Sequence, residues 1–249
     1  MEYKDFDLKK ELSEHTDEDY LGGFLPIENL NEEEDWRPYI TAKEYQADKY
    51  ETWSCVTFSI LKAFQAVVYK KYGEKLNLAE RFLAVASGTS EGGNSYKYVL
   101  QFFRKNGSVN EEDCQFPPTY EEWKNIEDLE SLMKIAQNLI PEKYNIQYER
   151  ISPIKRHNYL KCSPLLISVP AWFLKDDIYY RPDEMSDNHA TVEVAKNIVS
   201  DTYDPIEKKI DITPSVVYRL YVEKKNDMKD NIKKDYFRFW KIIKTFLGL

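Results

Sequence analysis

Residues 52–58 of this 249-residue chain read Thr-Trp-Ser-Cys-Val-Thr-Phe and lead into an apolar run over 56–64. Over residues 54–72, large apolar side chains recur at steps of three and four, which predicts an amphipathic helix, and Gly73 is suited to end it. The stripe consists of Phe58, Leu61, Phe64 and Val68. Cys55 thus stands in the first turn of a predicted helix. It is either a small buried core residue or a nucleophile whose thiolate the helix dipole stabilises.

The remaining first half of the chain also has helical periodicity. A cap at Asn77, with Glu80 three residues later, predicts a helix over 78–86. Two further helices are expected over 94–105, ended by Asn106-Gly107, and over 120–140, ended by Pro141. In the helix over 94–105 the inward residues are expected to be Tyr98, Phe102 and Phe103.

The second half has strand patterns. Apolar and polar residues alternate over 146–151 and 189–195, and 164–169 form an apolar run. Residues 216–222 are predicted as a further strand. Helices followed by strands predict an α+β protein with a helical lobe over 46–145 and a sheet lobe over 146–222, together one domain spanning 36–222. Residues 223–249 are expected to form an amphipathic helical tail, because 239, 242, 243 and 246 share one helical face.

Charge is concentrated at the N-terminus. Residues 1–35 hold 13 acidic and 3 basic side chains, and the whole chain has a net charge of −8, so the remainder is close to neutral. We expect 1–35 to be a solvated acidic extension. No broad basic surface is available to neutralise phosphates, which argues against nucleic-acid binding.

Several other classes of protein lack sequence support. The three cysteines, Cys55, Cys114 and Cys162, are widely spaced and form no Cys-x-x-Cys pair, so neither a disulfide scaffold nor a zinc site is expected. No nucleotide-binding glycine motif and no apolar run long enough for a membrane span is present, and we expect no cofactor. The N-terminus does not resemble a secretory signal, which favours a cytoplasmic location.

A reactive Cys55 would need a histidine from elsewhere in the chain. Among His15, His157 and His189, only His189 heads a regular strand pattern. His15 lies in the acidic extension, and His157, beside Lys155 and Arg156, is expected at the surface.

Six segments in order make the chain resemble the papain family of cysteine peptidases over residues 35–222. These are Asp35-Trp36-Arg37, Ser54-Cys55-Val56-Thr57-Phe58-Ser59, Ser90-Glu91-Gly92-Gly93 with the helix after it, Ser163-Pro164 with its apolar strand, Asn188-His189-Ala190-Thr191, and Asp201-Thr202-Tyr203-Asp204-Pro205. His189 lies 134 residues after Cys55 (189 minus 55), within the roughly 130–150 typical of that family.

The resemblance implies a two-lobed fold with an active-site cleft between a helical lobe and an antiparallel sheet or barrel lobe. It implies Cys55 as nucleophile, His189 as acid and base, Asp201 as the residue that orients the imidazole, and Gln46 as an oxyanion donor. Substrate-binding roles are expected for Gly92, Gly93, Trp53 and Asn188. The reaction implied is peptide-bond hydrolysis through a thioester.

Departures from the family pattern keep other interpretations open. Thr52 and Trp53 stand where the family has a cysteine and a glycine, Gln46 lies nine residues before Cys55, and Asp201 replaces an asparagine. If Trp53 spoils the oxyanion site, the protein binds peptides or partners without turnover, whereas an intact triad also permits acyl transfer to amines. The expected partner is a peptide or protein substrate, and the acidic extension or the C-terminal helix is a candidate docking element. Each site residue also has a plain structural alternative, such as a loop at Gly92-Gly93 or a turn at Asp201.

Overall fold

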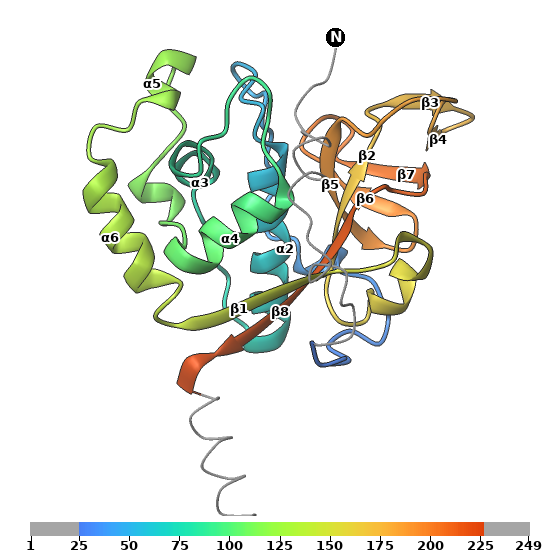
Figure 1. The fold of residues 1–249 in the computed structure, drawn as a ribbon, viewed down its shortest axis with the longest axis horizontal. Coiled ribbons are helices and arrows are strands. Elements are labelled where there is room, and N and C mark those ends of the chain that lie inside the picture. The colour runs from blue at the N-terminus through green and yellow to red at the C-terminus, as the bar shows by residue number, and fades with distance from the viewer. Residues whose placement is uncertain (1–24, 227–249) are drawn as a thin grey trace, which may run out of the picture.

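The computed structural model describes residues 25–226, with helices gathered on one side and most of the sheet on the other (Figure 1). The α-helices are α2 (Cys55–Tyr72), α3 (Glu80–Ala86), α4 (Tyr96–Asn106), α5 (Tyr120–Lys124) and α6 (Leu129–Leu139), and short 3₁₀ helices are η2 (Arg37–Tyr39), η3 (Glu111–Asp113) and η4 (Pro153–Tyr159). The strands are β1 (Tyr144–Arg150), β2 (Leu165–Val169), β3 (Phe173–Lys175), β4 (Ile178–Tyr180), β5 (His189–Ala195), β6 (Ile198–Ser200), β7 (Glu207–Asp211) and β8 (Val217–Lys224). The predicted α+β class, helices first and strands second, is confirmed.

Helix α2 is the central element of the molecule. Every residue from Cys55 to Val68 is buried, because the helix packs on β5 and β2 on one side and on α3 and α4 on the other (Figure 1). The helix ends as predicted at Gly73, whose φ of 70° is favourable for glycine and whose N–H donates to Tyr69 O. The core around α2 therefore joins the two lobes.

The strands form one sheet in the order β1-β8-β2-β5-β6-β7-β4-β3. All neighbours pair antiparallel except β4 and β7, which are parallel. Strands β2 and β5 are buried along their whole length, and their register sets Val169 opposite His189. His189 is thereby fixed where β5 begins and β2 ends.

The bounds of the helices after α2 differ from the sequence predictions at two places. Helix α3 begins at Glu80 instead of residue 78, because the Leu78 N–H donates to Gln65 Oε1 and Leu78 forms a β-bridge with Asn110. The predicted helix over 120–140 is divided into α5 and α6, and the Asp128 side chain caps the second part by accepting from Ser131 N–H.

Tyr98 was expected inside and is 42% exposed. The Ser95 cap sets the register of α4 so that Tyr96, Val99 and Leu100 face inward together with Phe103, which was predicted to do so.

In the sheet, the short strands β3, β4, β6 and β7 were not predicted, and β8 continues to Lys224. Of the acidic extension, Leu25 and Pro26 accept hydrogen bonds from the Arg219 guanidinium through their carbonyl oxygens. Most of that extension, His15 and the predicted C-terminal helix lie outside the described residues. Within 25–226, no helix has the length and apolar character needed to cross a membrane.

Candidate active site

His189 and Asp201 form a buried hydrogen-bonded pair. His189 begins β5, and Asp201 follows β6, the strand paired with β5. Nε2 of His189 lies 2.6 Å from Asp201 Oδ1, and neither side chain has exposed surface. Burial by itself raises the pKa of Asp201, but the electrostatic and hydrogen-bond interactions with His189 and Lys208 outweigh it and lower the pKa to about 2. Asp201 is therefore a carboxylate that accepts from the imidazole.

Lys208, which the sequence analysis missed, bonds the other oxygen of the same carboxylate. Its Nζ lies 2.7 Å from Asp201 Oδ2 and 2.6 Å from the carbonyl oxygens of Tyr203 and Pro205. Burial lowers the pKa of Lys208, and Asp201 opposes that effect. Lys208 and Ile210 are the buried residues of β7, so the register of this strand turns Lys208 inward.

Two aromatic rings enclose the imidazole. The ring centroid of Trp172 lies 5.6 Å and that of Tyr203 5.4 Å from that of His189. Lys208 Nζ also lies 5.0 Å from the Trp172 centroid, so this indole contacts both ends of the His189–Asp201–Lys208 row. The rings keep water from the hydrogen bond between His189 and Asp201.

Cys55 is the first residue of α2 and is fully buried. The N-cap residue, Ser54, makes no side-chain capping bond, so its hydroxyl does not occupy the positive end of the helix dipole. From the same helix, Lys62 Nζ donates to Asp201 O at 2.8 Å. Helix α2 and the Asp201 segment are thus in direct contact.

The segment before Cys55 is tied to the segment after Asp201 by three hydrogen bonds. Gln46 Nε2 donates to Tyr203 OH at 2.7 Å, Thr202 Oγ1 donates to Gln46 Oε1 at 2.8 Å, and Tyr203 OH donates to Glu51 Oε2 at 2.6 Å. Because Tyr203 also lies against the His189 ring, these bonds place Gln46 and the segment before Cys55 next to the His189–Asp201 pair.

Glu51, also absent from the sequence predictions, organises this segment. Its Oε1 accepts from the backbone N–H groups of Thr52 and Trp53 and from Gln46 Nε2, each at 2.9 Å. The Gln46 amide therefore donates to both Glu51 and Tyr203, and an oxyanion role requires one of these bonds to give way.

Trp53 has a backbone φ of 51°, in the left-handed region that favours glycine. This geometry gives a physical reason for the glycine that the resembled family has at this position. The Trp53 indole packs edge-on against Tyr120, with ring centroids 5.4 Å apart. Trp53 is accommodated at a backbone position that strains any residue with a Cβ atom.

Gly92 and Gly93 form a turn at the start of the segment that leads into α4. Gly93 has a φ of 74° and its N–H donates to Ser90 O, so the turn itself requires glycine there. Gly92 is exposed, and a Cβ atom added to it would meet only Ser90 Oγ, at 3.8 Å. The fold of the chain does not require glycine at position 92.

Asn188, directly before His189, is partly buried. Its Oδ1 accepts from Ala171 N–H at 2.8 Å, and its own N–H donates to Val169 O. These bonds join the start of β5 to the loop after β2, and so orient the residue that precedes the imidazole.

Cys114 and Cys162, like Cys55, are buried in the described structure and form no disulfide. Burial raises the pKa of Cys114 to about 11 and also raises the pKa of Cys162. His157, expected at the surface, is instead partly buried, with Nε2 3.0 Å from Glu193 Oε1.

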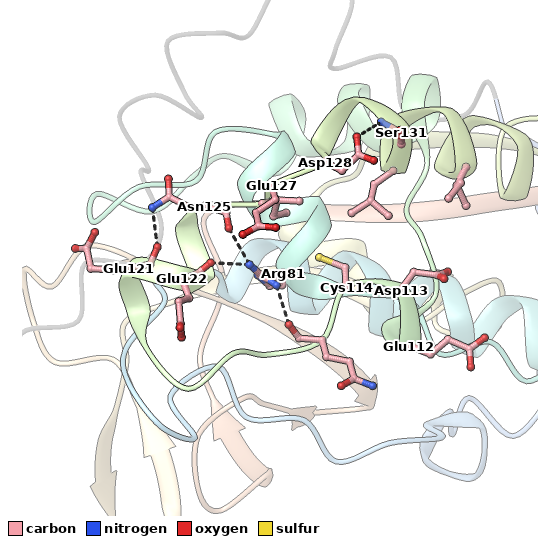
Figure 2. A pocket seen from close by; sticks show the side chains of 14 residues that line it. Arg81, Glu112, Asp113, Cys114, Glu121, Glu122, Asn125, Glu127, Asp128 and Ser131 are labelled. Atoms are coloured by element: carbon pink, nitrogen blue, oxygen red, sulfur yellow. Dashed lines mark hydrogen bonds between the residues drawn. The ribbon is translucent and has the colours of Figure 1, made fainter.

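A cavity of about 810 Å³ lies in the helical lobe, with Cys114 in its lining (Figure 2). Its rim carries acidic side chains from α5, η3 and the loop before α6, and Arg81 donates to the backbone carbonyls of Gln115, Glu122 and Asn125. None of the predicted site residues lines it. Across residues 25–226, no group of three or more His, Cys, Asp or Glu side chains is arranged to hold a metal ion.

Two solved structures with a similar fold are a bromelain protease and a stem bromelain precursor. The chain is similar to the bromelain protease from Ananas comosus in complex with the E64 inhibitor, with a TM-score of 0.57 and 15% identity over 76% of this chain and 96% of that one. It is also similar to a recombinant stem bromelain precursor, with a TM-score of 0.55 and 14% identity over 77% of this chain and 70% of that one. No family model and no curated protein sequence matches. The chain therefore has the papain-like α+β fold of bromelain.

Proposed function

We propose that this protein is a cysteine peptidase that hydrolyses peptide bonds with Cys55, His189 and Asp201. The observation that carries the proposal is the buried hydrogen bond between His189 Nε2 and Asp201 Oδ1, on a fold shared with bromelain proteases. When Nε2–H donates to the carboxylate, the lone pair of the neutral imidazole lies on Nδ1. That nitrogen is the base that the proposal assigns to the Cys55 thiol.

In the proposed reaction, His189 takes the thiol proton and the Cys55 sulfur forms a bond to the peptide carbonyl carbon. The protonated imidazole then gives its proton to the leaving amine as the carbon–nitrogen bond breaks, which leaves a thioester. Water attacks the thioester and gives a proton to His189, the carbon–sulfur bond breaks, the departing sulfur of Cys55 takes that proton, and the acid product leaves. Asp201 holds the ring in the required tautomer throughout.

Oxyanion stabilisation is assigned to the Cys55 backbone N–H at the start of α2 and to the Gln46 amide. Gln46 lies in the hydrogen-bonded segment between Glu51 and Tyr203, so its amide reaches the oxyanion only after exchanging one of these partners. Gly92 supports binding of an extended peptide, because no side chain obstructs the backbone there and the fold itself does not demand glycine.

The direct test is peptide hydrolysis by the purified protein. A library of fluorogenic peptides, assayed at several pH values, is expected to contain cleaved sequences, and Cys55→Ala is expected to abolish cleavage while leaving the circular dichroism spectrum unchanged. Cys114→Ala is the matched control, since it removes a buried thiol remote from the site and is expected to retain cleavage. Equal cleavage by wild type and Cys55→Ala would remove the assignment.

A second candidate function is peptide or partner binding on the same fold without turnover. One observation favours it: Cys55 and His189 both have no exposed surface, so a substrate reaches the sulfur only if covering groups move. For this candidate, peptides that bind to the wild type would bind equally to Cys55→Ala, and none would be cleaved by either.

A further inference from the structure

We propose that Lys208 is a positioning residue for His189. In this arrangement the buried Asp201–Lys208 ion pair acts as a charge-compensated acceptor in place of the neutral asparagine of the resembled family. The inference rests on the proposed function, and it concerns how the histidine is tuned for that reaction.

The first step is the division of one carboxylate between two partners. Oδ1 of Asp201 faces His189 Nε2 at 2.6 Å, and Oδ2 faces Lys208 Nζ at 2.7 Å. The side chains of Asp201 and His189 have no exposed surface and that of Lys208 is 1% exposed. Solvent therefore does not screen the pair, and each charge acts strongly on the other.

The second step is the charge of Lys208. Its Nζ lies within hydrogen-bond distance of three oxygen acceptors, which are Asp201 Oδ2, Tyr203 O and Pro205 O. An ammonium group has three N–H donors and satisfies all of them, whereas a neutral amine has two. The indole face of Trp172 also stabilises a cation here. The environment therefore fits a charged lysine.

The other charged groups around Asp201 come from the packed elements on each side. Lys62 of α2 donates to the Asp201 carbonyl, and the charges of Glu44 and Glu80 oppose the lowering of its pKa by burial. Asp204, in the loop before β7, likewise opposes the lowering of the pKa of Lys208. Of these groups, Lys208 alone bonds the carboxylate oxygen that His189 leaves unoccupied. It therefore has the most direct control over the charge that the imidazole faces.

The consequence follows from electrostatics. An isolated buried aspartate would stabilise the imidazolium strongly and make the ring slow to give up its proton. Lys208 cancels part of that field. The ring therefore keeps an acceptor for Nε2–H, while the net charge of its partner approaches that of a neutral amide. The asparagine-to-aspartate replacement and the buried lysine are thus two parts of one arrangement.

The test is the titration of the His189 ring by NMR, with ¹⁵N-labelled histidine, in a Cys55→Ala background that removes any coupling to the thiol. Lys208→Met is expected to raise the midpoint of the His189 titration by about one pH unit, the order expected when a cation is removed from a partly screened buried site. Asp201→Asn is expected to lower it, and to shift the ring toward the Nδ1–H tautomer, because the Lys208 ammonium then competes for the amide oxygen.

The double variant Asp201→Asn/Lys208→Met is the decisive member of the set. It removes both charges together, so it leaves no uncompensated buried ion and also serves if a single variant does not fold. Its titration midpoint is expected within about half a unit of the reference, with the Nε2–H tautomer restored. A Lys208→Met midpoint equal to the reference, or a double variant as far from it as Asp201→Asn, would overturn the inference.

This result is separable from the proposed function. The rate at which iodoacetamide alkylates Cys55 in the wild-type protein measures the reactivity of the thiol, whereas the NMR titration measures the protonation of the His189 ring. If Cys55 shows no enhanced reactivity, the peptidase proposal fails, and the His189 titration still decides the role of Lys208.

Discussion

Nε2 of His189 lies 2.6 Å from Oδ1 of Asp201, and the two side chains are enclosed together with no exposed surface. The bond joins the first residue of β5 to the residue after β6, so the pairing of these two strands positions it. Because the bond engages Nε2, the chemistry proposed for this site uses Nδ1.

Trp53 provides a test of the strain before Cys55. A φ of 51° favours glycine over any residue with a Cβ atom. Replacing Trp53 by Gly or Ala removes the same contact with Tyr120. The free energy of unfolding of Trp53→Gly is therefore expected to exceed that of Trp53→Ala by about 1 kcal/mol, measured by urea denaturation.

The Ala variant is the control for the lost indole, since only the backbone preference separates the two changes. If Trp53→Ala proved the more stable, the left-handed conformation at this position would be wrong. Peptidase assays on the same pair show whether the indole limits access to Cys55.

Glu51 is expected to hold the segment before Cys55 in place. Its carboxylate accepts from Thr52 N–H, Trp53 N–H, Gln46 Nε2 and Tyr203 OH. Glu51→Gln keeps the shape but removes the charge and replaces one acceptor oxygen by a donor, so the free energy of unfolding is expected to fall by about 1–3 kcal/mol. Chemical denaturation measures the change, and kcat/KM is expected to fall with it.

Asp48→Asn is the matched control for Glu51→Gln, because Asp48 is an exposed acid in the same segment. It is expected to change stability by less than about 0.5 kcal/mol. Equal stability of the wild type and Glu51→Gln would show that the carboxylate does not organise the segment.

Glu111 predicts a pH dependence of stability. Burial, followed by the charge of Glu44, raises the pKa of Glu111 to about 7 from its ordinary value of 4.5. Between these two pH values the folded protein binds more protons at this site than the unfolded chain does, so the contribution of Glu111 to stability falls as pH rises from about 4.5 to 7. Burial also raises the pKa of the neighbouring Glu80, which acts in the same direction.

Glu111→Gln is expected to reduce that fall, as measured by thermal unfolding at pH values from 4.5 to 8. The exposed Glu112 is the control, and Glu112→Gln is expected to leave the pH profile of the wild type. A Glu111→Gln profile as steep as that of the wild type would contradict the raised pKa.

The sequence predicted best where periodicity and burial agree. The Cys55 helix and its Gly73 end were predicted because an apolar stripe and a left-handed glycine are local signals, and the strands that became β1, β2, β5 and β8 carry β-branched or alternating patterns. The break between α5 and α6 was missed because a local cap at Asp128 interrupts an otherwise continuous helical pattern. The shorter strands have too few residues to show a period.

The site was predictable only in part. A single sequence has no signal for a lysine that bonds the far oxygen of Asp201, or for a glutamate that accepts four hydrogen bonds, because both depend on contacts made by the folded chain. The inward register of Lys208 beside Ile210 is visible only in the folded strand β7. The departures at Trp53 and Asp201 were visible in the sequence, and the structure supplies their physical context in a left-handed backbone and a buried ion pair.

The reactivity of the Cys55 sulfur tests the central proposal most directly. Iodoacetamide at pH 6, followed by peptide mass spectrometry, is expected to label Cys55 in the folded wild type, through the same movement of covering groups that admits a substrate. It is expected to spare Cys114 and Cys162, whose pKa values burial raises. His189→Ala is expected to slow that labelling at least about tenfold, because the thiolate loses its partner. Labelling of Cys55 no faster than that of an ordinary thiol, or unchanged in His189→Ala, would contradict the account.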